Sequence, residues 1–155
     1  MRYLAVDLGD RRTGLGVGDD ETRVASPVGV VEIPLTQRER LIGAIVHRAA
    51  EEEVGALVVG VPLHMDGSAS PRAAVSRAFA ADLGRAAGLA VHEQDERLTS
   101  VRADHQMART GLTHKQKKRR RDALAAAAIL EAFFEHHRGG SAVRSEEAGS
   151  SEPHA

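Results

Sequence analysis

The segment RYLAVDLGDRRTGLGVGDD, residues 2–20, contains two short apolar runs separated by a polar turn that has a glycine near each end. RYLAVDLG is typical of a buried strand, and TGLGVGDD predicts a second strand whose glycines permit close approach of a neighbouring element. Alternation along the first strand places Tyr3, Ala5 and Asp7 on one face of the sheet. We therefore expect Asp7 at the carboxyl end of a buried strand.

The pattern downstream of these strands predicts the remaining elements. TRVASPVGVVEIP reads as a third strand, which gives an antiparallel meander. A helix is expected after Thr36 as N-cap, followed by the buried strand GALVVGVP. A helix from Pro71 to about Ala87, a strand GLAVHEQ, a short helix over 98–108 and a final helix over about 119–137 complete the series. The fold class is therefore α/β, with a mixed five-stranded sheet and helices on both faces.

The length of 155 residues suits one domain with a substantial core. From residue 139 onward the sequence holds one Arg, three Glu and almost no large apolar side chain, so its formal charge is −2. Residues 1–138 then carry 20 basic and 19 acidic residues. We expect 1–138 to form the domain and 139–155 to be a disordered tail, because the tail has too little apolar surface to offset its ordering entropy.

Composition excludes several classes of protein. There is no cysteine, so disulfides and thiolate metal sites are ruled out. The longest apolar runs are too short to cross a bilayer and no signal peptide is recognisable, which predicts a cytoplasmic protein without a membrane partner. With one Tyr, three Phe and no Trp, an aromatic base-stacking platform is not expected. The histidines lack metal-ligand spacing and are expected to be non-ligands.

Three acidic residues lie where predicted elements begin or end. Asp7 ends the first strand, and Glu96, within DERLTS at 95–100, follows the last one. If those strands are neighbours, both carboxylates lie at one end of the sheet. Asp122 shares a helical stripe with the apolar residues at 126, 129 and 133, so it should face the sheet. Converging carboxylates repel one another and raise each other's pKa values unless a divalent cation compensates them.

Each acid also has an ordinary structural interpretation. Asp7 could cap a turn with Gly9, and the acid pair of DERLTS could form an ion pair with Arg97. Asp122 could lie in the first turn of a helix, where it would favour the helix dipole. Position alone leaves the choice between these interpretations and a metal site open.

The segment KQKKRRR, residues 115–121, carries six positive charges and every lysine of the chain. Charge runs are often merely solvated, but a cationic segment beside an acidic metal site suits a phosphodiester substrate. The nucleic-acid-binding candidates are Arg11, Arg12, Arg97, Lys115, Lys117, Lys118, Arg119, Arg120 and Arg121.

Two glycine-containing turns are candidates for backbone contact with a phosphate. DLGDRRTG, with Gly9 and Gly14, has the form D-x-G-x-x-x-x-G, which also occurs in the phosphate loop of actin-like ATPases and sugar kinases. Those proteins need a second lobe, for which this chain has no room. VVGVPLHMDGS contains Gly60, Pro62 and Gly67, and we expect a positive φ at Gly67. An ordinary strand-to-helix turn is the alternative for this second segment.

Four blocks in this order, DLGDRRTGLGVGD, ALVVGVPLHMDGS, DERLTS and KKRRRDALAAAAIL, resemble the YqgF-type pre-16S rRNA nucleases, which are also described as Holliday junction resolvase-like proteins. The resemblance covers residues 2–137 and implies an RNase H-like fold. It also implies that Asp7, Glu96 and Asp122 are the catalytic residues and hold Mg²⁺ or Mn²⁺. Asp10 departs from the family pattern, in which a small or hydroxyl residue is more usual.

The resemblance implies a two-metal-ion phosphodiester hydrolase that processes the 5′ end of pre-16S rRNA in ribosome biogenesis. Its partners would be structured RNA and ribosomal precursor particles. A branched DNA junction is the alternative substrate, and its symmetric cleavage would call for a homodimer rather than a monomer. A non-catalytic ribosome-assembly or transcription factor that uses only the basic segment is a further alternative, and a nucleotide-binding ATPase is another.

Overall fold

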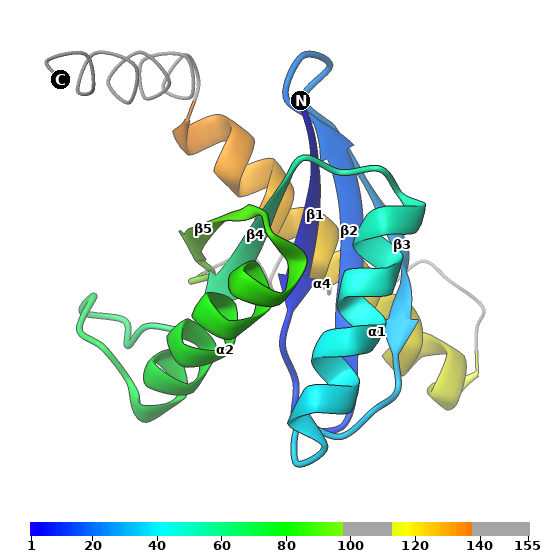
Figure 1. Cartoon of the computed structure of the whole chain (residues 1–155). Coiled ribbons are helices and arrows are strands. Elements are labelled where there is room, and N and C mark those ends of the chain that lie inside the picture. Colours follow the sequence, from blue (N-terminus) through cyan, green and yellow to red (C-terminus); the bar gives the residue numbers. More distant parts are fainter. Residues whose placement is uncertain (98–112, 138–155) are drawn as a thin grey trace, which may run out of the picture.

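A computed structural model of the chain describes residues 1–97 and 113–137 (Figure 1). Within these ranges five strands form one sheet in the order β3-β2-β1-β4-β5. Strands β1, β2 and β3 are antiparallel neighbours, whereas β4 and β5 run parallel to β1. The strands are β1 (Arg2–Asp7), β2 (Thr13–Asp19), β3 (Val24–Val31), β4 (Ala56–Val61) and β5 (Ala90–Asp95). The predicted mixed five-stranded sheet is confirmed.

Helices cover both faces of the sheet. α1 (Arg38–Glu51) and α2 (Pro71–Ala87) lie on one face, and α4 (His114–His136) crosses the other (Figure 1). The short helix expected over 98–108 and the tail expected over 139–155 lie outside the described residues. In the part of the chain that the structure describes, no helix has the length and apolar character needed to cross a membrane.

The sheet separates two apolar cores. Leu4 packs with Leu41 and Phe79 of α1 and α2, whereas Tyr3 packs with Ile129 of α4. All five side chains are at most 3% exposed. The alternation predicted along the first strand is therefore confirmed, and its odd-numbered positions face α4.

Two predicted helix starts were wrong. α4 begins at His114, five residues before the predicted start, because Thr113 and Gln116 form a reciprocal capping box. Lysine and arginine are good helix formers, so the basic segment continues this helix rather than preceding it. Gln37 occupies the N-cap of α1 in place of Thr36, and its side chain makes no capping hydrogen bond. Pro71 does begin α2, after Ser70 as N-cap.

Alternate glycines of β2 allow α4 to lie directly on the sheet backbone. A Cβ built on Gly14 would lie 1.9 Å from the carbonyl oxygen of Asp122, and one on Gly16 would lie 2.9 Å from the amide nitrogen of Ala127. Any side chain at these positions would push the helix outward. The distance of α4 from the sheet therefore depends on these glycines.

Candidate active site

Asp7 is the last residue of β1 and lies on the face covered by α4. It pairs in register with Gly14 of β2, the residue against which the backbone of Asp122 packs. The side chain of Asp7 is half-buried. Asp7 is therefore placed between the end of the sheet and the N-terminal half of α4.

Glu96 directly follows β5 at the same end of the sheet, because β1, β4 and β5 run parallel. The condition considered from the sequence, that β1 and the last strand are neighbours, is not met, because β4 lies between them. Gly60 of β4 has no side chain, so the side chain of Glu96 can extend across β4 toward β1. A Cβ on Gly60 would lie 2.5 Å from Oε2 of Glu96, so the carboxylate occupies the volume that a side chain would fill.

Asp122 comes from the third layer, within α4. Its Oδ2 accepts a hydrogen bond from Nε of Arg12 at 2.8 Å, and its side chain is 25% exposed. The alternative that Asp122 lies in the first helical turn was wrong, because the helix begins two turns earlier at His114. Asp122 therefore owes its position to packing on β2 and to the ion pair with Arg12.

The three carboxylates interact electrostatically. Burial, followed by the negative charges of Glu96 and Asp122, raises the pKa of Asp7 from 3.8 to about 8, and Arg72 opposes the shift. The pKa of Glu96 is also raised, mainly by burial. The charge of Arg72 opposes this shift and that of the neighbouring Asp95 adds to it. The cationic side chains nearby therefore do not cancel the effect of burial and repulsion on Asp7, and a bound divalent cation would oppose both.

Arg72, in the first turn of α2, is the site residue that the sequence prediction missed. Its Nη1 donates to Oδ1 of Asp10 at 2.6 Å, and its Nη2 donates to the carbonyl oxygen of Leu8 at 3.2 Å. These contacts hold the guanidinium beside the β1–β2 turn, where it lowers the pKa values of both Asp7 and Glu96. The unusual acid at position 10 was the available signal, because an extra carboxylate near a phosphate-handling site calls for a cation.

The predicted cationic residues divide between the site and other surfaces. Arg12 is paired with Asp122, as described above, and Arg97 is paired with Asp95 through Nε at 2.7 Å. The interpretation of the DERLTS acid pair as a partner of Arg97 is thus correct for Asp95. Arg97 also donates to the carbonyl oxygen of Met65 at 3.0 Å, which ties the end of β5 to the β4–α2 loop.

The basic segment itself forms the first two turns of α4. Arg119 forms an ion pair with Glu32 at 2.6 Å. Arg11, Lys115, Lys118, Arg120 and Arg121 are exposed, and Lys117 is half-buried. The segment thus presents a cationic surface that adjoins Asp122 along the helix.

The predicted glycine and proline positions are structural parts of the two turns. A Cβ on Gly9 would lie 2.2 Å from the carbonyl oxygen of Arg12, so the β1–β2 turn is tight there. The carbonyl oxygen of Pro62 accepts the Ser70 hydroxyl that also caps α2. Gly67 has a φ of 91°, as predicted. Ser68 beside it donates to Oδ1 of Asp66.

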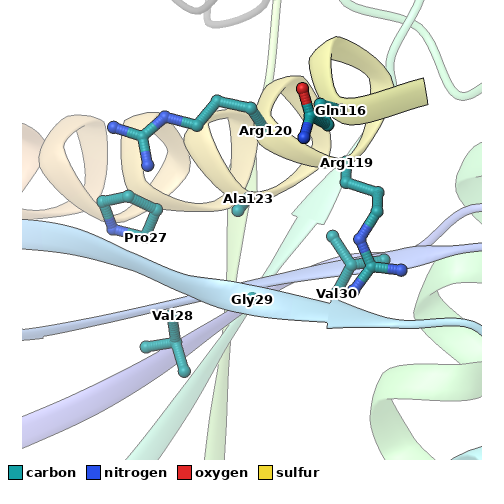
Figure 2. A pocket seen from close by; sticks show the side chains of 8 residues that line it. All are labelled: Pro27, Val28, Gly29, Val30, Gln116, Arg119, Arg120 and Ala123. Atoms are coloured by element: carbon teal, nitrogen blue, oxygen red, sulfur yellow. The ribbon is translucent and has the colours of Figure 1, made fainter. Parts of the chain in front are cut away.

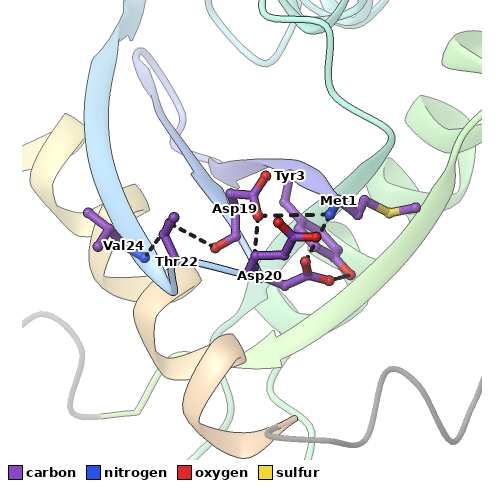
Figure 3. A network of polar contacts seen from close by, with 7 residues as sticks. Met1, Tyr3, Asp19, Asp20, Thr22 and Val24 are labelled. Carbon is purple, nitrogen blue, oxygen red and sulfur yellow. Dashed lines mark hydrogen bonds and ion pairs between the residues drawn. The ribbon is translucent and has the colours of Figure 1, made fainter.

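A second acidic group lies at the opposite end of β1 and shows the contrast (Figure 3). There the amino group of Met1 donates to Oδ1 of Asp20 at 2.8 Å and lies 3.9 Å from Oδ1 of Asp19. The hydrogen bond to Asp20 raises the pKa of that amino group. A positive charge from the protein lies against this acidic group, whereas burial and two neighbouring carboxylates together raise the pKa of Asp7.

Oxygen-only donors of this kind suit Mg²⁺ or Mn²⁺. In residues 1–97 and 113–137, however, no three His, Asp or Glu side chains already adopt an arrangement that could hold a metal ion. Asp122 is turned toward Arg12, and Glu96 lies over Gly60. The oxygen donors of these residues therefore fit such an ion. In this structure, however, the side chains of Asp122 and Glu96 are oriented by contacts with the protein rather than toward a shared ion.

The model of the family "RuvX: Holliday junction resolvase" matches residues 1–136. The chain belongs to the RuvX family. A relative from Anaeromyxobacter sp. (strain Fw109-5), named "Putative pre-16S rRNA nuclease", is 42% identical over 116 residues, 75% of this chain and 83% of the relative. A protein of the same name from Maridesulfovibrio salexigens is 35% identical over 117 residues, 76% of this chain and 85% of the relative. The predicted family is confirmed, and it places this RuvX protein among the nucleases.

Solved structures confirm the fold of this RuvX protein. Thermus thermophilus RuvC in complex with a Holliday junction substrate aligns with a TM-score of 0.58 at 18% identity, over 90% of this chain and 96% of that chain. The Fowlpox virus resolvase bound to Holliday junction DNA aligns with a TM-score of 0.53 at 10% identity, over 88% and 98%. These likenesses show the RNase H-like fold alone.

Proposed function

We propose that this RuvX protein is a divalent-metal-dependent nuclease that trims the 5′ end of pre-16S rRNA in the cytoplasm. The observation that carries the proposal is the coupling of three carboxylates from three separate elements at one end of the sheet. Burial, together with repulsion from Glu96 and Asp122, raises the pKa of Asp7 to about 8. A fold tolerates such a cost when a ligand compensates it, and a divalent cation is the simplest ligand with this effect.

In this proposal Asp7, Glu96 and Asp122 hold Mg²⁺ or Mn²⁺, as one ion or as a pair. When bound, such an ion acidifies water and stabilises negative charge on the oxygens of a phosphodiester. The protein supplies the remaining functions. Arg72 offers a guanidinium at the same sheet end, and the basic turns of α4 orient the nucleic-acid backbone.

The ion pair between Arg12 and Asp122 has a definite role in the proposal. A cation shared by all three carboxylates requires this contact to open or to be shared, because Arg12 already donates to Asp122. Once released, the Arg12 guanidinium is free to bind a phosphate of the substrate. Arg12 would then link metal binding to substrate binding.

Ribosomal precursor RNA is the first candidate substrate because the relatives named above carry that activity in their names. A four-way DNA junction is the second, favoured by the description of the matching family as a Holliday junction resolvase. Cutting a junction symmetrically requires two active sites. The junction hypothesis therefore also predicts a homodimer, whereas RNA trimming is compatible with a monomer.

The test is a cleavage assay with a 5′-extended pre-16S fragment and a synthetic four-way junction, each titrated with Mg²⁺ or Mn²⁺. Asp7→Asn, Glu96→Gln and Asp122→Asn should each lower the rate by at least about 100-fold. Glu39→Gln is the matched control, because it removes an exposed carboxylate from α1 on the other face of the sheet. Rates for this variant should stay within about twofold of the wild type.

The outcomes separate the candidate functions. Cleavage of the RNA alone supports the proposal, and cleavage of the junction alone by a dimer supports the resolvase. If neither is cleaved but both bind, and the carboxylate variants bind as well as the wild type, the chain is a nucleic-acid-binding factor rather than a nuclease. Stabilisation by ATP without any binding of nucleic acid would support the ATPase alternative.

A further inference from the structure

A groove separates the edge strand β3 from the N-terminal half of α4 (Figure 2). Its volume is about 270 Å³, and its floor is formed by β3 and by Ala123 of α4. Figure 2 shows Pro27 and Val30 on the helix side of the strand, while Val28 points to the opposite face. The floor is therefore apolar and short. Its lining residues are Pro27, Val28, Gly29, Val30, Gln116, Arg119, Arg120 and Ala123.

Polar side chains of α4 form the rim of this groove. Arg119 and Arg120 follow Gln116 by about one helical turn, and all three lie above the floor (Figure 2). Arg119 is held by Glu32, which fixes its guanidinium at one end. Arg120 is exposed, so its guanidinium remains available at the other end. An apolar floor with a cation and an amide at the rim suits a planar heterocycle that carries a phosphate.

The groove lies close to the proposed catalytic carboxylates. Val30 pairs in register with Gly14, and Gly14 pairs with Asp7, so the groove floor is two strands away from Asp7. Two strand spacings amount to about 10 Å. Ala123, which lines the groove, directly follows Asp122 along the helix. A nucleic-acid strand that crosses α4 could therefore contact both places with neighbouring nucleotides.

We propose that the groove between β3 and α4 binds one unpaired nucleotide of the substrate, next to the phosphodiester that is cleaved. The base would lie on Pro27 and Val30, and Arg120 would bind its phosphate or stack on the base, as arginine does in RNA-binding proteins. This inference rests on the proposed function in taking nucleic acid as the substrate and in placing cleavage at the three carboxylates. It adds that the substrate must carry a single-stranded segment beside the cleavage position.

The size of the groove favours one base over a duplex. Pockets that enclose a drug-sized ligand span about 300–1,000 Å³, and this groove lies just below that range. A duplex presents its grooves and phosphates across more than about 12 Å and cannot enter it. The charge around the groove favours nucleic acid over a peptide, because Arg119 and Arg120 of the rim belong to the segment 115–121, in which six of seven residues are cationic.

Binding to short oligoribonucleotides, measured by fluorescence anisotropy in EDTA, tests the proposal without any cleavage. The probes are a single strand and a blunt duplex of the same sequence. Val30→Phe fills the groove, and Val24→Phe is its matched control, because Val24 lies on the same strand, 61% exposed and away from the groove. Arg120→Gln is paired with Lys118→Gln, which removes the same charge about 160° away around the helix.

Val30→Phe should weaken binding of the single strand roughly tenfold, the order expected for losing one base contact. Its affinity for the duplex should stay within about twofold, and Val24→Phe should change neither. Arg120→Gln should weaken binding of the single strand more than that of the duplex, whereas Lys118→Gln should weaken both alike. If Val30→Phe fails to fold, the comparison of Arg120→Gln with Lys118→Gln decides.

Several results would overturn the groove proposal. One is equal loss of single-strand and duplex affinity in the Arg120 and Lys118 variants; another is unchanged single-strand affinity in a folded Val30→Phe variant. Light scattering that shows a dimer dissociated by Val30→Phe would assign the groove to a second copy of the chain. Absence of cleavage with the expected binding pattern would remove the nuclease proposal and leave the groove assignment intact.

Discussion

Replacing Asp7 with Asn should stabilise the metal-free protein, although Asp7 is central to the proposed site. The pKa of Asp7 is raised from 3.8 to about 8 by burial and by the charges of Glu96 and Asp122. Between these two pH values the folded chain therefore holds a proton that the unfolded chain has released. Because the folded state binds more protons, the free energy of unfolding falls as pH rises through this window. Asn removes the ionisation and with it this part of the fall.

The magnitude follows from the size of the shift. One pKa unit corresponds to about 1.4 kcal/mol, and pH 7 lies roughly 3 units above the unshifted pKa of 3.8, so the part of the shift traversed by pH 7 would cost the wild type about 4 kcal/mol. Asp7 keeps some contact with solvent, which reduces the cost, and we take about 2 kcal/mol as the expected gain. For a chain of this length that corresponds to an increase in Tm of roughly 4–8 °C. The gain should be near zero at pH 4 and should level off above pH 8.

The assay is thermal unfolding of the wild type and Asp7→Asn in EDTA across this pH range, followed by the same series in Mn²⁺. The metal should stabilise the wild type, because it binds only the folded carboxylates, and should have little effect on the variant. The difference in Tm should therefore shrink or reverse in Mn²⁺. Glu39→Gln serves as the control and should show neither the pH-dependent gain nor a reduced response to metal.

The reasoning would be refuted by an Asp7→Asn variant that is no more stable than the wild type in EDTA at pH 8. A gain of the same size at pH 4 and pH 8 would refute it equally, because a packing effect would then explain the gain. If the gain follows pH as expected and Mn²⁺ stabilises both proteins alike, the carboxylate repulsion is real and the metal site lies elsewhere.

Three further predictions test contacts of the site and the packing of α4 on the sheet. Arg12→Gln should raise the affinity for Mn²⁺ roughly 3- to 10-fold, measured by thermal-shift titration, because a competing ion pair worth about 1 kcal/mol is lost. Gly16→Ala should lower the free energy of unfolding, measured in urea, by about 1–3 kcal/mol, because its Cβ meets the α4 backbone. Gly43→Ala is the control: its Cβ has open space in α1, so it should raise the free energy of unfolding by about 0.5–1 kcal/mol. In the Arg72→Gln variant the pKa of Asp7 should rise further, because Arg72 lowers it in the wild type. The free energy of unfolding should therefore continue to fall up to a higher pH than in the wild type, which unfolding midpoints measured from pH 5 to about 9 would show.

Local periodicity was enough to predict most of the fold. The alternation through Tyr3, Ala5 and Asp7 assigned the correct face, because the side-chain period of a strand is fixed by its backbone. The insertion of β4 between β1 and β5 was not predictable in the same way. It depends on pairing between segments distant in sequence, which no local pattern encodes. The early start of α4 had a local signal, the capping box of Thr113 and Gln116. It was missed because the charged residues that follow were interpreted as a segment preceding the helix.

The acidic residues of the candidate site were predicted from the sequence, whereas Arg72, which lies beside them, was not. Asp7, Glu96 and Asp122 were recognisable because acids are unusual at such positions. Arg72 was not, because a single arginine in the first turn of a helix has no distinctive pattern. Only the folded chain brings it to Asp10 and to the carboxylates. Their roles as metal ligands and catalytic residues stay predictions for the experiments above.

The positions of the carboxylates depend as much on missing side chains as on the acids themselves. Gly14 lets the backbone of Asp122 approach β2, and Gly60 leaves the volume in which the carboxylate of Glu96 lies. A larger residue at either position would move one acid away from Asp7 without changing any charge. Because repulsion among these acids raises the pKa of Asp7, such a change should make the chain lose the repulsion together with the proposed metal site. The same close packing stabilises the fold through the contact of α4 with β2, and it also holds the three acids near one another. A ligand that needs all three carboxylates together would explain why acids occupy these closely packed positions.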